Sequence, residues 1–270
     1  MSTAADLLNL GVVEYQEALA LQHALAAEVA AGTRPDTVLF LEHPPTITLG
    51  RRTEEGEVHV PAGAEVAVVE VDRGGKSTYH APGQLVCYPI LDLTRHGQDV
   101  KRYCRDLEEA LIRTLAAFGI DATRSEGLTG VWLESPPRKI ASIGIHLSKW
   151  VSTHGYALNV DLDPAPFTNW ITACGLDGYA FTSMARELGR PLPVGDVRPA
   201  AAQAFADVFD ISFTELPPAA AAHLGPVPSD GGARLRSWRQ RSNSWPGSAS
   251  SQPPRSRLPS PSGFSSAERL

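Results

Sequence analysis

A dense group of polar side chains lies between two apolar runs, at residues 71–84. The segment reads Val-Asp-Arg73-Gly74-Gly75-Lys76-Ser77-Thr78-Tyr79-His80-Ala-Pro82-Gly83-Gln84. Paired glycines allow backbone N–H groups to approach a ligand closely, and the Gly-Gly and Pro-Gly pairs are strong loop signals. Taken alone, the segment is equally consistent with the wall of a binding site and with an ordinary polar loop.

Cys174 is a candidate nucleophile on residue type. It follows an apolar stretch, precedes Gly175 and stands at a break in the pattern, where a thiol can be exposed with free N–H groups nearby. Most single cysteines are structural, however, and Cys87 is expected to be a small core side chain. The three cysteines, with no CxxC spacing, argue against a disulfide framework and against a zinc site.

Several elements can be predicted around these residues. Short apolar runs at 66–71 and 85–91 indicate two buried strands that flank the polar loop, and residues 37–42 indicate a third. Helical spacing of apolar residues predicts helices from about 15 to 31 and from 99 to 118. Residues 129–133 and 138–147 are predicted to form two antiparallel strands, with Lys139 at the start of the second. A lysine in that place is usually solvated.

Composition limits the class of protein. The chain has 270 residues and a net charge of −6, but its last 46 residues carry seven Arg against two acidic residues. The remaining acidic body argues against nucleic acid or an anionic membrane as the main partner. We expect a folded domain at 1–216 and a Pro-, Ser- and Arg-rich, disordered tail at 217–270. The sequence shows no secretory signal and no membrane-spanning run, which favours the cytoplasm.

Three motifs together resemble the protein octanoyltransferases, which share a fold with the biotin and lipoate protein ligases. The first is Arg-Gly-Gly-x-x-Thr-x-His-x-Pro-Gly-Gln at residues 73–84, preceded by Glu-His-Pro-Pro-x-x-Thr-x-Gly-Arg at residues 42–51. The second is Lys139-Ile-Ala-Ser-Ile-Gly144, and the third is Ala173-Cys174-Gly175-Leu176, in which Ala173 replaces the family proline. The resemblance covers about residues 10–213.

The resemblance implies an α+β domain with a mixed, largely antiparallel sheet flanked by helices. It implies that Cys174 is the nucleophile and Lys139 its acid–base partner, so that octanoyl passes from octanoyl-acyl-carrier protein to a lysine of an apo lipoyl domain through a Cys174 thioester. The implied substrate-binding residues are Arg73, Gly74, Gly75, Lys76, Ser77, Thr78, Tyr79, His80, Ser142, Ile143, Gly144, Gly155, Tyr156 and Ala157.

The same resemblance implies no ATP and no metal, because thioester exchange is nearly balanced and thioester-to-amide transfer is downhill. The expected partners are octanoyl-acyl-carrier protein, the lipoyl domains of 2-oxoacid dehydrogenase E2 subunits and the glycine cleavage H protein, with the enzyme a monomer. Two alternatives stay open: an ATP-dependent lipoate or biotin protein ligase, and a non-catalytic homologue that binds acylated carrier protein. A Cys–His hydrolase is disfavoured, because no histidine lies in a hydrolase signature.

Overall fold

The structure is a computed structural model that describes residues 2–171 and 180–224. Its elements in chain order are β1 (Thr3–Val12), α1 (Tyr15–Ala30), β2 (Asp36–Glu42), β3 (Thr46–Leu49), β4 (Ala67–Glu70), β5 (Thr78–His80), β6 (Gln84–Ile90), α2 (Val100–Ala116), β7 (Thr123–Ser125), β8 (Leu128–Leu133), β9 (Arg138–Ser148), β10 (Val151–Asn159), α3 (Ala165–Asn169), β11 (Ala180–Phe181), α4 (Met184–Leu188), α5 (Val194–Phe209), β12 (Ile211–Leu216) and the 3₁₀ helix η2 (Pro218–Leu224).

A mixed sheet forms the centre of the described chain. Its strand order is β12-β1-β2-β6-β10-β9-β8-β7, with β11 beside β9, and the pairs from β2 to β7 are antiparallel, whereas β1 pairs in parallel with β2 and β12. A second sheet has the order β4-β3-β5. The expected α+β fold with a largely antiparallel sheet is therefore confirmed, and the second sheet adds to it.

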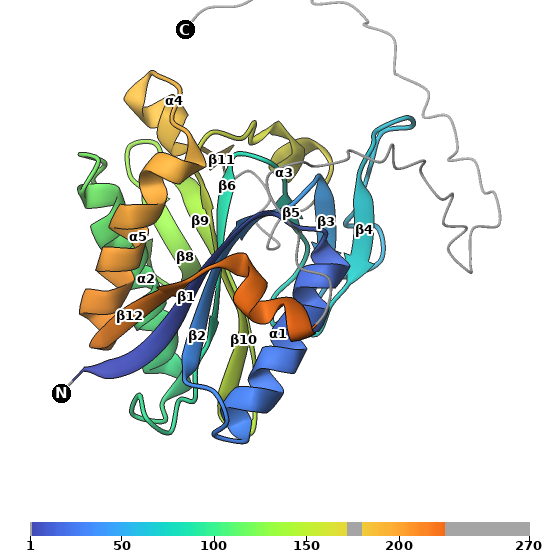
Figure 1. Cartoon of the computed structure of the whole chain (residues 1–270). Coiled ribbons are helices and arrows are strands. Elements are labelled where there is room, and N and C mark those ends of the chain that lie inside the picture. Colours follow the sequence, from blue (N-terminus) through green and yellow to red (C-terminus); the bar gives the residue numbers. More distant parts are fainter. Residues whose placement is uncertain (1, 172–179, 225–270) are drawn as a thin grey trace, which may run out of the picture. The chain divides into compact units, whose positions relative to one another are not determined.

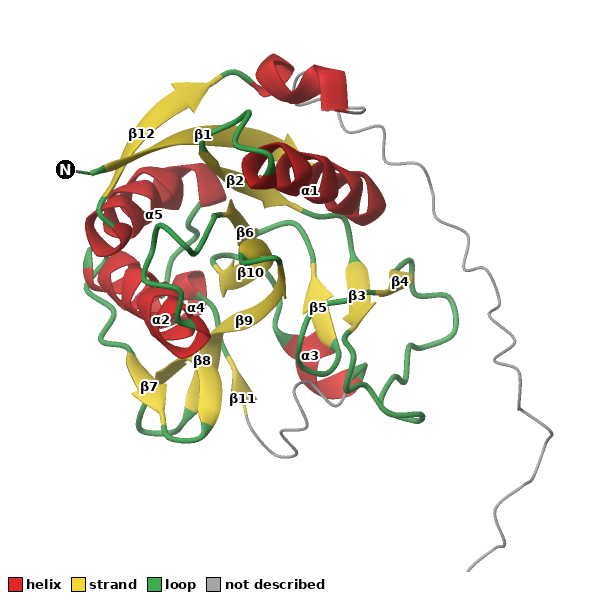
Figure 2. Ribbon diagram, turned by 90° about the horizontal axis from the view of Figure 1, so that it is seen from below, coloured by secondary structure: helices red, strands yellow, loops and turns green. Residues whose placement is uncertain are grey.

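Helices cover both faces of the central sheet, with α2 and α5 on one side and α1 on the other (Figures 1 and 2). Strand residues alternate between these two cores: Val38 and Phe40 pack with α2 and α5, whereas Leu39 and Leu41 pack with α1. Because both faces are buried, β2 and β6 each contain a continuous run without charged residues, at 38–41 and 85–90, instead of alternating apolar and polar residues. Cys87 is fully buried in the first core, as expected.

The polar loop differs from its prediction in two ways. Residues 78–80 form the strand β5, paired with β3, and the expected buried strand at 66–71 is the half-exposed β4, in which Val68 is 39% exposed. The prediction that this strand is buried was wrong. Val66, just before β4, is buried in a third core with residues of β3, β5 and α3, whereas the residues of β4 itself are half-buried or exposed in alternation.

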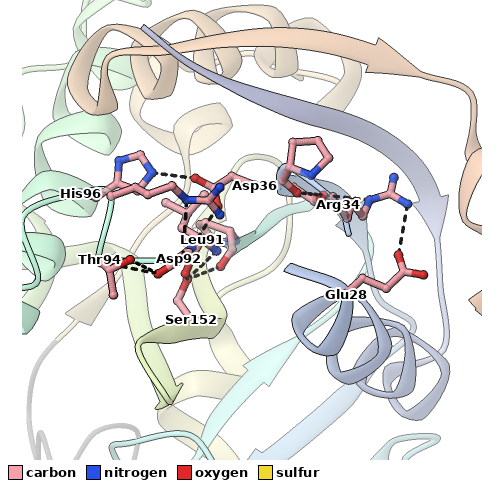
Figure 3. Close-up of polar contacts among 12 residues, drawn as sticks. Glu28, Arg34, Asp36, Leu91, Asp92, Thr94, His96 and Ser152 are labelled. Atoms are coloured by element: carbon pink, nitrogen blue, oxygen red, sulfur yellow. Dashed lines mark hydrogen bonds and ion pairs between the residues drawn. The ribbon is translucent and has the colours of Figure 1, made fainter. Parts of the chain in front are cut away.

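A buried carboxylate fixes the loop that follows β6. Asp36, at the start of β2, has no exposed surface and accepts hydrogen bonds from the Asp92 backbone N–H (2.9 Å), the Arg95 guanidinium (2.8 Å) and His96 Nε2 (2.7 Å) (Figure 3). A buried charge is tolerated when it is paired and hydrogen-bonded in this way. The network lies at the opposite end of β2 from Glu42 and His43.

The folded chain continues past residue 216. Residues 218–224 form η2, and Ala221 is buried in the core beside α1. Residues 225–270, the greater part of the expected disordered tail, lie outside the described residues, so the expected boundary at 216/217 stays a prediction. The described residues include no helix that is long and apolar enough to cross a membrane.

Candidate active site

A cleft of about 470 Å³, including its open mouth, lies where the residue 73–80 segment meets β9, β10 and the start of α1. The first turn of α1 and β6 supply Tyr15 and Tyr88. The segment 73–80 supplies Arg73, Gly75, Lys76, Thr78 and His80. The neighbouring strands β9 and β10 supply Ser142, Ile143, Gly144, His154, Gly155, Tyr156 and Ala157. The β9–β10 register pairs Gly144 with Gly155 and so brings the cleft residues of β9 beside those of β10.

Most of the expected substrate-binding residues line this cleft, and three do not. Gly74 donates its backbone N–H to Ile145 O (3.0 Å), Ser77 is buried, and Tyr79 packs edge-on against Phe167 and Trp170 in the third core. These three residues hold the loop in place beside the cleft wall. What any of the residues binds stays a prediction.

Arg73 shapes the loop. Its guanidinium donates to Thr48 O (3.0 Å), Thr48 Oγ1 (2.7 Å), Gly74 O (3.0 Å) and Lys76 O (2.8 Å). A buried guanidinium that makes four such bonds fixes the curve of the backbone around itself. Lys76 in turn forms ion pairs with Glu57 and, at 3.2 Å, with Glu54, so its ammonium is held at the rim of the cleft.

Lys139 is buried, with 3% of its surface exposed, which differs from the usual solvated lysine at a strand end. Its Nζ donates to Thr129 O (3.0 Å) and lies 5.2 Å from the centroid of the Trp132 ring. Space for the side chain comes from Gly130, since a Cβ there would lie 2.7 Å from Lys139 Cε. Lys139 does not line the cleft itself. It lies three residues before Ser142 on β9, a separation of about 10 Å along a strand.

Cys174 lies outside the described residues, together with Gly175 and Leu176. The described chain on both sides of this segment is anchored. Before it, Ile171 is buried and forms a bridge with Val58. After it, β11 runs parallel to β9 and pairs Phe181 with Lys139, and the Thr182 N–H donates to Lys139 O (2.9 Å).

Three cleft residues were not predicted from the sequence: Tyr15, Tyr88 and His154. Tyr15 and His154 are separated by many residues from the loop motif and come to the cleft through tertiary packing, whereas Tyr88 lies just beyond the motif, in β6. Tyr15 begins α1, Tyr88 shares the inner face of β6 with Val86, and His154 stands at φ +57° in β10. The one available signal was the isolated polar ring of Tyr88 in a strand that is otherwise apolar.

Burial dominates the electrostatics of the ring cluster beside the cleft. It lowers the pKa of His43 and of His154 to about 4, lowers the pKa of His80 well below its ordinary value, and raises the pKa of Tyr15 to about 12. These rings are therefore neutral near pH 7. The carboxylate of Asp72, which His154 Nε2 contacts at 2.8 Å, partly offsets the effect of burial on that histidine.

The part of the chain that the structure describes contains no group of three or more His, Cys, Asp and Glu side chains placed to hold a metal ion. The expectation that the enzyme needs no metal stays a prediction, because residues 172–179 and 225–270 are not described.

Comparison with known proteins identifies the family. Residues 14–206 match the lipoyl protein ligase A/B catalytic domain. The chain is 48% identical over 202 residues to the octanoyltransferase of Geobacter metallireducens, which covers 75% of this chain and 92% of that protein. It is 47% identical over 213 residues to the octanoyltransferase of Mycobacterium leprae, which covers 77% and 89%.

Solved structures agree on the fold. A bipartite lipoate protein ligase from Thermoplasma acidophilum superposes with a TM-score of 0.68 at 17% identity, covering 82% of this chain and 90% of that one. A lipoate-protein ligase A bound with ATP has a TM-score of 0.65 at 18% identity, covering 83% and 92%. The expected ligase-type fold is thus confirmed, as is an enzyme that transfers an acyl group in protein lipoylation. The chain therefore belongs to the family of lipoyl protein ligase A/B catalytic domains, and its curated relatives place it among the octanoyltransferases.

Proposed function

We propose that this enzyme moves octanoyl from octanoyl-acyl-carrier protein to a specific lysine of an apo lipoyl domain, through a thioester on Cys174 assisted by Lys139. One observation carries the proposal. Lys139 is buried on β9. The described chain that follows the Cys174 segment rejoins the sheet beside it, as β11, where Phe181 pairs with Lys139. A buried lysine beside a cleft is uncommon outside functional sites.

In the first half-reaction the sulfur of Cys174 attacks the thioester carbon of the carrier-bound octanoyl group, while Lys139 holds the proton that the thiol has given up. The carbon–sulfur bond to pantetheine breaks, and the leaving thiolate takes the proton from Lys139. Octanoyl is then attached to the enzyme, and the proton of the Cys174 thiol has passed to pantetheine by way of Lys139. A neighbouring basic group is the usual way to activate a thiol, which alone is only a few per cent thiolate near neutral pH.

In the second half-reaction the ε-amine of the acceptor lysine attacks the enzyme thioester. Lys139 accepts a proton from the amine and passes it to the Cys174 sulfur as the carbon–sulfur bond breaks. The products are an octanoyl amide and the free enzyme, so no nucleotide is consumed. Backbone N–H groups at Ser142–Gly144 or at Gly175–Leu176 stabilise the oxyanion in both halves. The cleft walls at Ile143, Tyr156 and Ala157 receive the acyl chain.

The proposed partners are those that the family resemblance implies: octanoyl-acyl-carrier protein as donor, and as acceptors the lipoyl domains of 2-oxoacid dehydrogenase E2 subunits and the glycine cleavage H protein. We propose a monomeric enzyme that acts in the cytoplasm without ATP or metal. The substrate-binding set is the one that lines the cleft, with Gly74, Ser77 and Tyr79 supporting it from behind.

Intact-mass measurement tests the proposal. The full chain is incubated with octanoyl-acyl-carrier protein, without nucleotide, and an apo lipoyl domain is then added. The wild type should gain one octanoyl group and pass it on. Cys174→Ala should gain none, and Lys139→Met, which retains an unbranched side chain beside Trp132, should be acylated and deacylated far more slowly. Octanoylation of the lipoyl domain by Cys174→Ala, or only with free octanoate and ATP, would refute the proposal and favour a ligase.

A further inference from the structure

His80 is held in one orientation at the wall of the cleft. Its ring lies 5.7 Å from the ring of Tyr15 and 5.5 Å from that of His43, measured between centroids, and only 6% of the residue is exposed. Its Nδ1 lies 2.7 Å from Gln84 Oε1. The function of this ring depends on which of its two nitrogens carries the proton.

The hydrogen bonds behind His80 determine where that proton is. The Thr182 carbonyl can only accept, so Asn159 Nδ2 donates to it (2.9 Å) and Asn159 Oδ1 is left as an acceptor. Gln84 Nε2 donates to Asn159 Oδ1 (3.0 Å) and to Tyr79 O (3.2 Å). Gln84 Oε1 is therefore an acceptor as well, and the proton of the His80 ring is on Nδ1.

The other nitrogen of His80 then carries a lone pair. Burial keeps the ring neutral, since it lowers the pKa well below its ordinary value. No described residue forms a hydrogen bond with Nε2, yet Nε2 is not sealed in the interior, because the ring lines the cleft. His80 therefore presents an acceptor to the cleft and no donor.

The neighbouring tyrosines follow the same pattern. His43 Nδ1 donates to Val13 O (2.7 Å), so its Nε2 accepts from Tyr88 OH (2.8 Å). His154 Nε2 donates to Asp72, so its Nδ1 accepts from Tyr15 OH at a longer 3.4 Å. Both hydroxyl hydrogens thus point into the protein. This part of the wall is suited to a ligand that donates hydrogen bonds.

We propose that His80 Nε2 accepts an N–H from the ε-amine of the acceptor lysine and orients it for attack on the enzyme thioester. The inference rests on the proposed function and assigns a role within its second half-reaction. A neutral amine has two N–H bonds and one lone pair. Holding one N–H at His80 turns the lone pair toward the thioester carbon.

His80 keeps its own proton and takes none during this step. The nitrogen–carbon bond forms as the carbonyl π pair moves to oxygen, and Lys139 removes the other amine proton and delivers it to the departing sulfur. The alternative role, donation from Nε2 to the oxyanion, is inconsistent with the proton on Nδ1. In the first half-reaction no amine is present, so this hydrogen bond is made only in the second.

Two substitutions separate the two nitrogens of the ring. His80→Asn keeps a donor near the Nδ1 position for Gln84 and removes the acceptor at Nε2. His80→Gln places an amide oxygen near the Nε2 position and loses the Nδ1 donor. Each variant is acylated with octanoyl-acyl-carrier protein, the octanoyl-enzyme is isolated, and its single-turnover transfer to an apo lipoyl domain is timed. Circular dichroism checks that each variant is folded.

Because His80 lines the cleft that receives the acyl chain, we expect acylation to slow in both variants, and the inference concerns the additional slowing of transfer. Transfer should be about tenfold slower for His80→Asn, the size of one lost hydrogen bond, and closer to the wild type for His80→Gln. Equal slowing of both half-reactions, or unchanged transfer in His80→Asn, would overturn the inference while leaving the proposed function in place. If the wild type transfers nothing, the proposed function itself fails.

A second measurement does not depend on activity. In protein labelled with ¹⁵N-histidine, the ring whose signals disappear in His80→Asn should show a protonated Nδ1 and an unprotonated Nε2 at pH 7. A proton on Nε2 in the wild type would refute the proposed role directly.

Discussion

Gly130→Ala should test whether the position of Lys139 depends on a missing side chain. Gly130 has φ +115°, and a Cβ at this residue would lie 2.5 Å from Ala141 O, 2.7 Å from Lys139 Cε and 3.2 Å from Lys139 Nζ. The backbone carbonyl belongs to the β9 strand and cannot move far, so the lysine side chain must give way. Its bond to Thr129 O would then be lost.

The cost has two parts. Placing a non-glycine residue at this φ costs on the order of 1–3 kcal/mol, and forcing an extra methyl group into a packed site costs about 1–3 kcal/mol more. We therefore expect unfolding free energy to fall by about 2–6 kcal/mol, a large share of the ~5–15 kcal/mol typical of a domain. If Lys139 is displaced by about 1 Å, octanoyl transfer should slow by on the order of 10²-fold.

Gly127→Ala is the matched control in the same hairpin. Gly127 has φ +74°, but a Cβ there would contact nothing within 4 Å. That variant should lose only about 1–2 kcal/mol of strain and keep its transfer rate. The assay combines urea unfolding with single-turnover transfer at a temperature where both variants are folded. If Gly130→Ala matches Gly127→Ala in midpoint and in rate, Lys139 does not depend on the space at Gly130.

Three further predictions concern stability. Burial lowers the pKa of His43 and His154 to about 4, so below about pH 6.5 the unfolded chain binds protons that the folded chain does not. The free energy of unfolding should be at its full value above pH 6.5 and about 2–4 kcal/mol lower at pH 5. A urea midpoint that does not change between pH 7 and pH 5 would contradict this. Asp36→Asn should lower the free energy of unfolding by about 3 kcal/mol, because it weakens a buried charged network. Octanoyl transfer should be unchanged at low temperature, and unfolding and transfer assays on one preparation would check both. Gly155→Ala should cost about 3 kcal/mol, because a Cβ there would lie 2.2 Å from Cys87 O in the neighbouring strand; unaltered thermal unfolding would refute the clash.

The elements that the sequence predicted well are those buried along one face, such as a helix on a sheet, and those buried at every position of a continuous run. Helix α2 begins one residue after Asp99, whose carboxylate accepts from the N–H groups of Lys101 and Arg102, and its apolar stripe packs on the sheet. Strand β6 is buried at every position, as its apolar run indicated. Local pattern suffices in such segments because neighbouring residues share one environment.

The cleft was only partly predictable, for a physical reason. The residue 73–80 motif marks one wall, but Tyr15 on α1 and His154 on β10 reach the cleft through tertiary packing between residues far apart in the chain. The role of Arg73 was also hidden. As a donor in a polar loop it suggested ligand binding, which stays a prediction, and its four bonds to protein acceptors show that it also shapes the loop. No local pattern separates these two uses of a guanidinium.

Asn159 links the β9–β11 pairing beside Lys139 to the position of the proton on the His80 ring. The β9–β11 pair places Thr182 against Lys139, and the Thr182 carbonyl then fixes the amide of Asn159. That amide uses its donor on Thr182 and its acceptor on Gln84, so neither an aspartate nor an apolar residue of similar size could satisfy both neighbours. Through Gln84 the same orientation determines the proton on His80. A change at Asn159 or Thr182 would therefore affect the surroundings of Lys139, the proposed acid–base partner, and of His80, the proposed amine-binding residue, together.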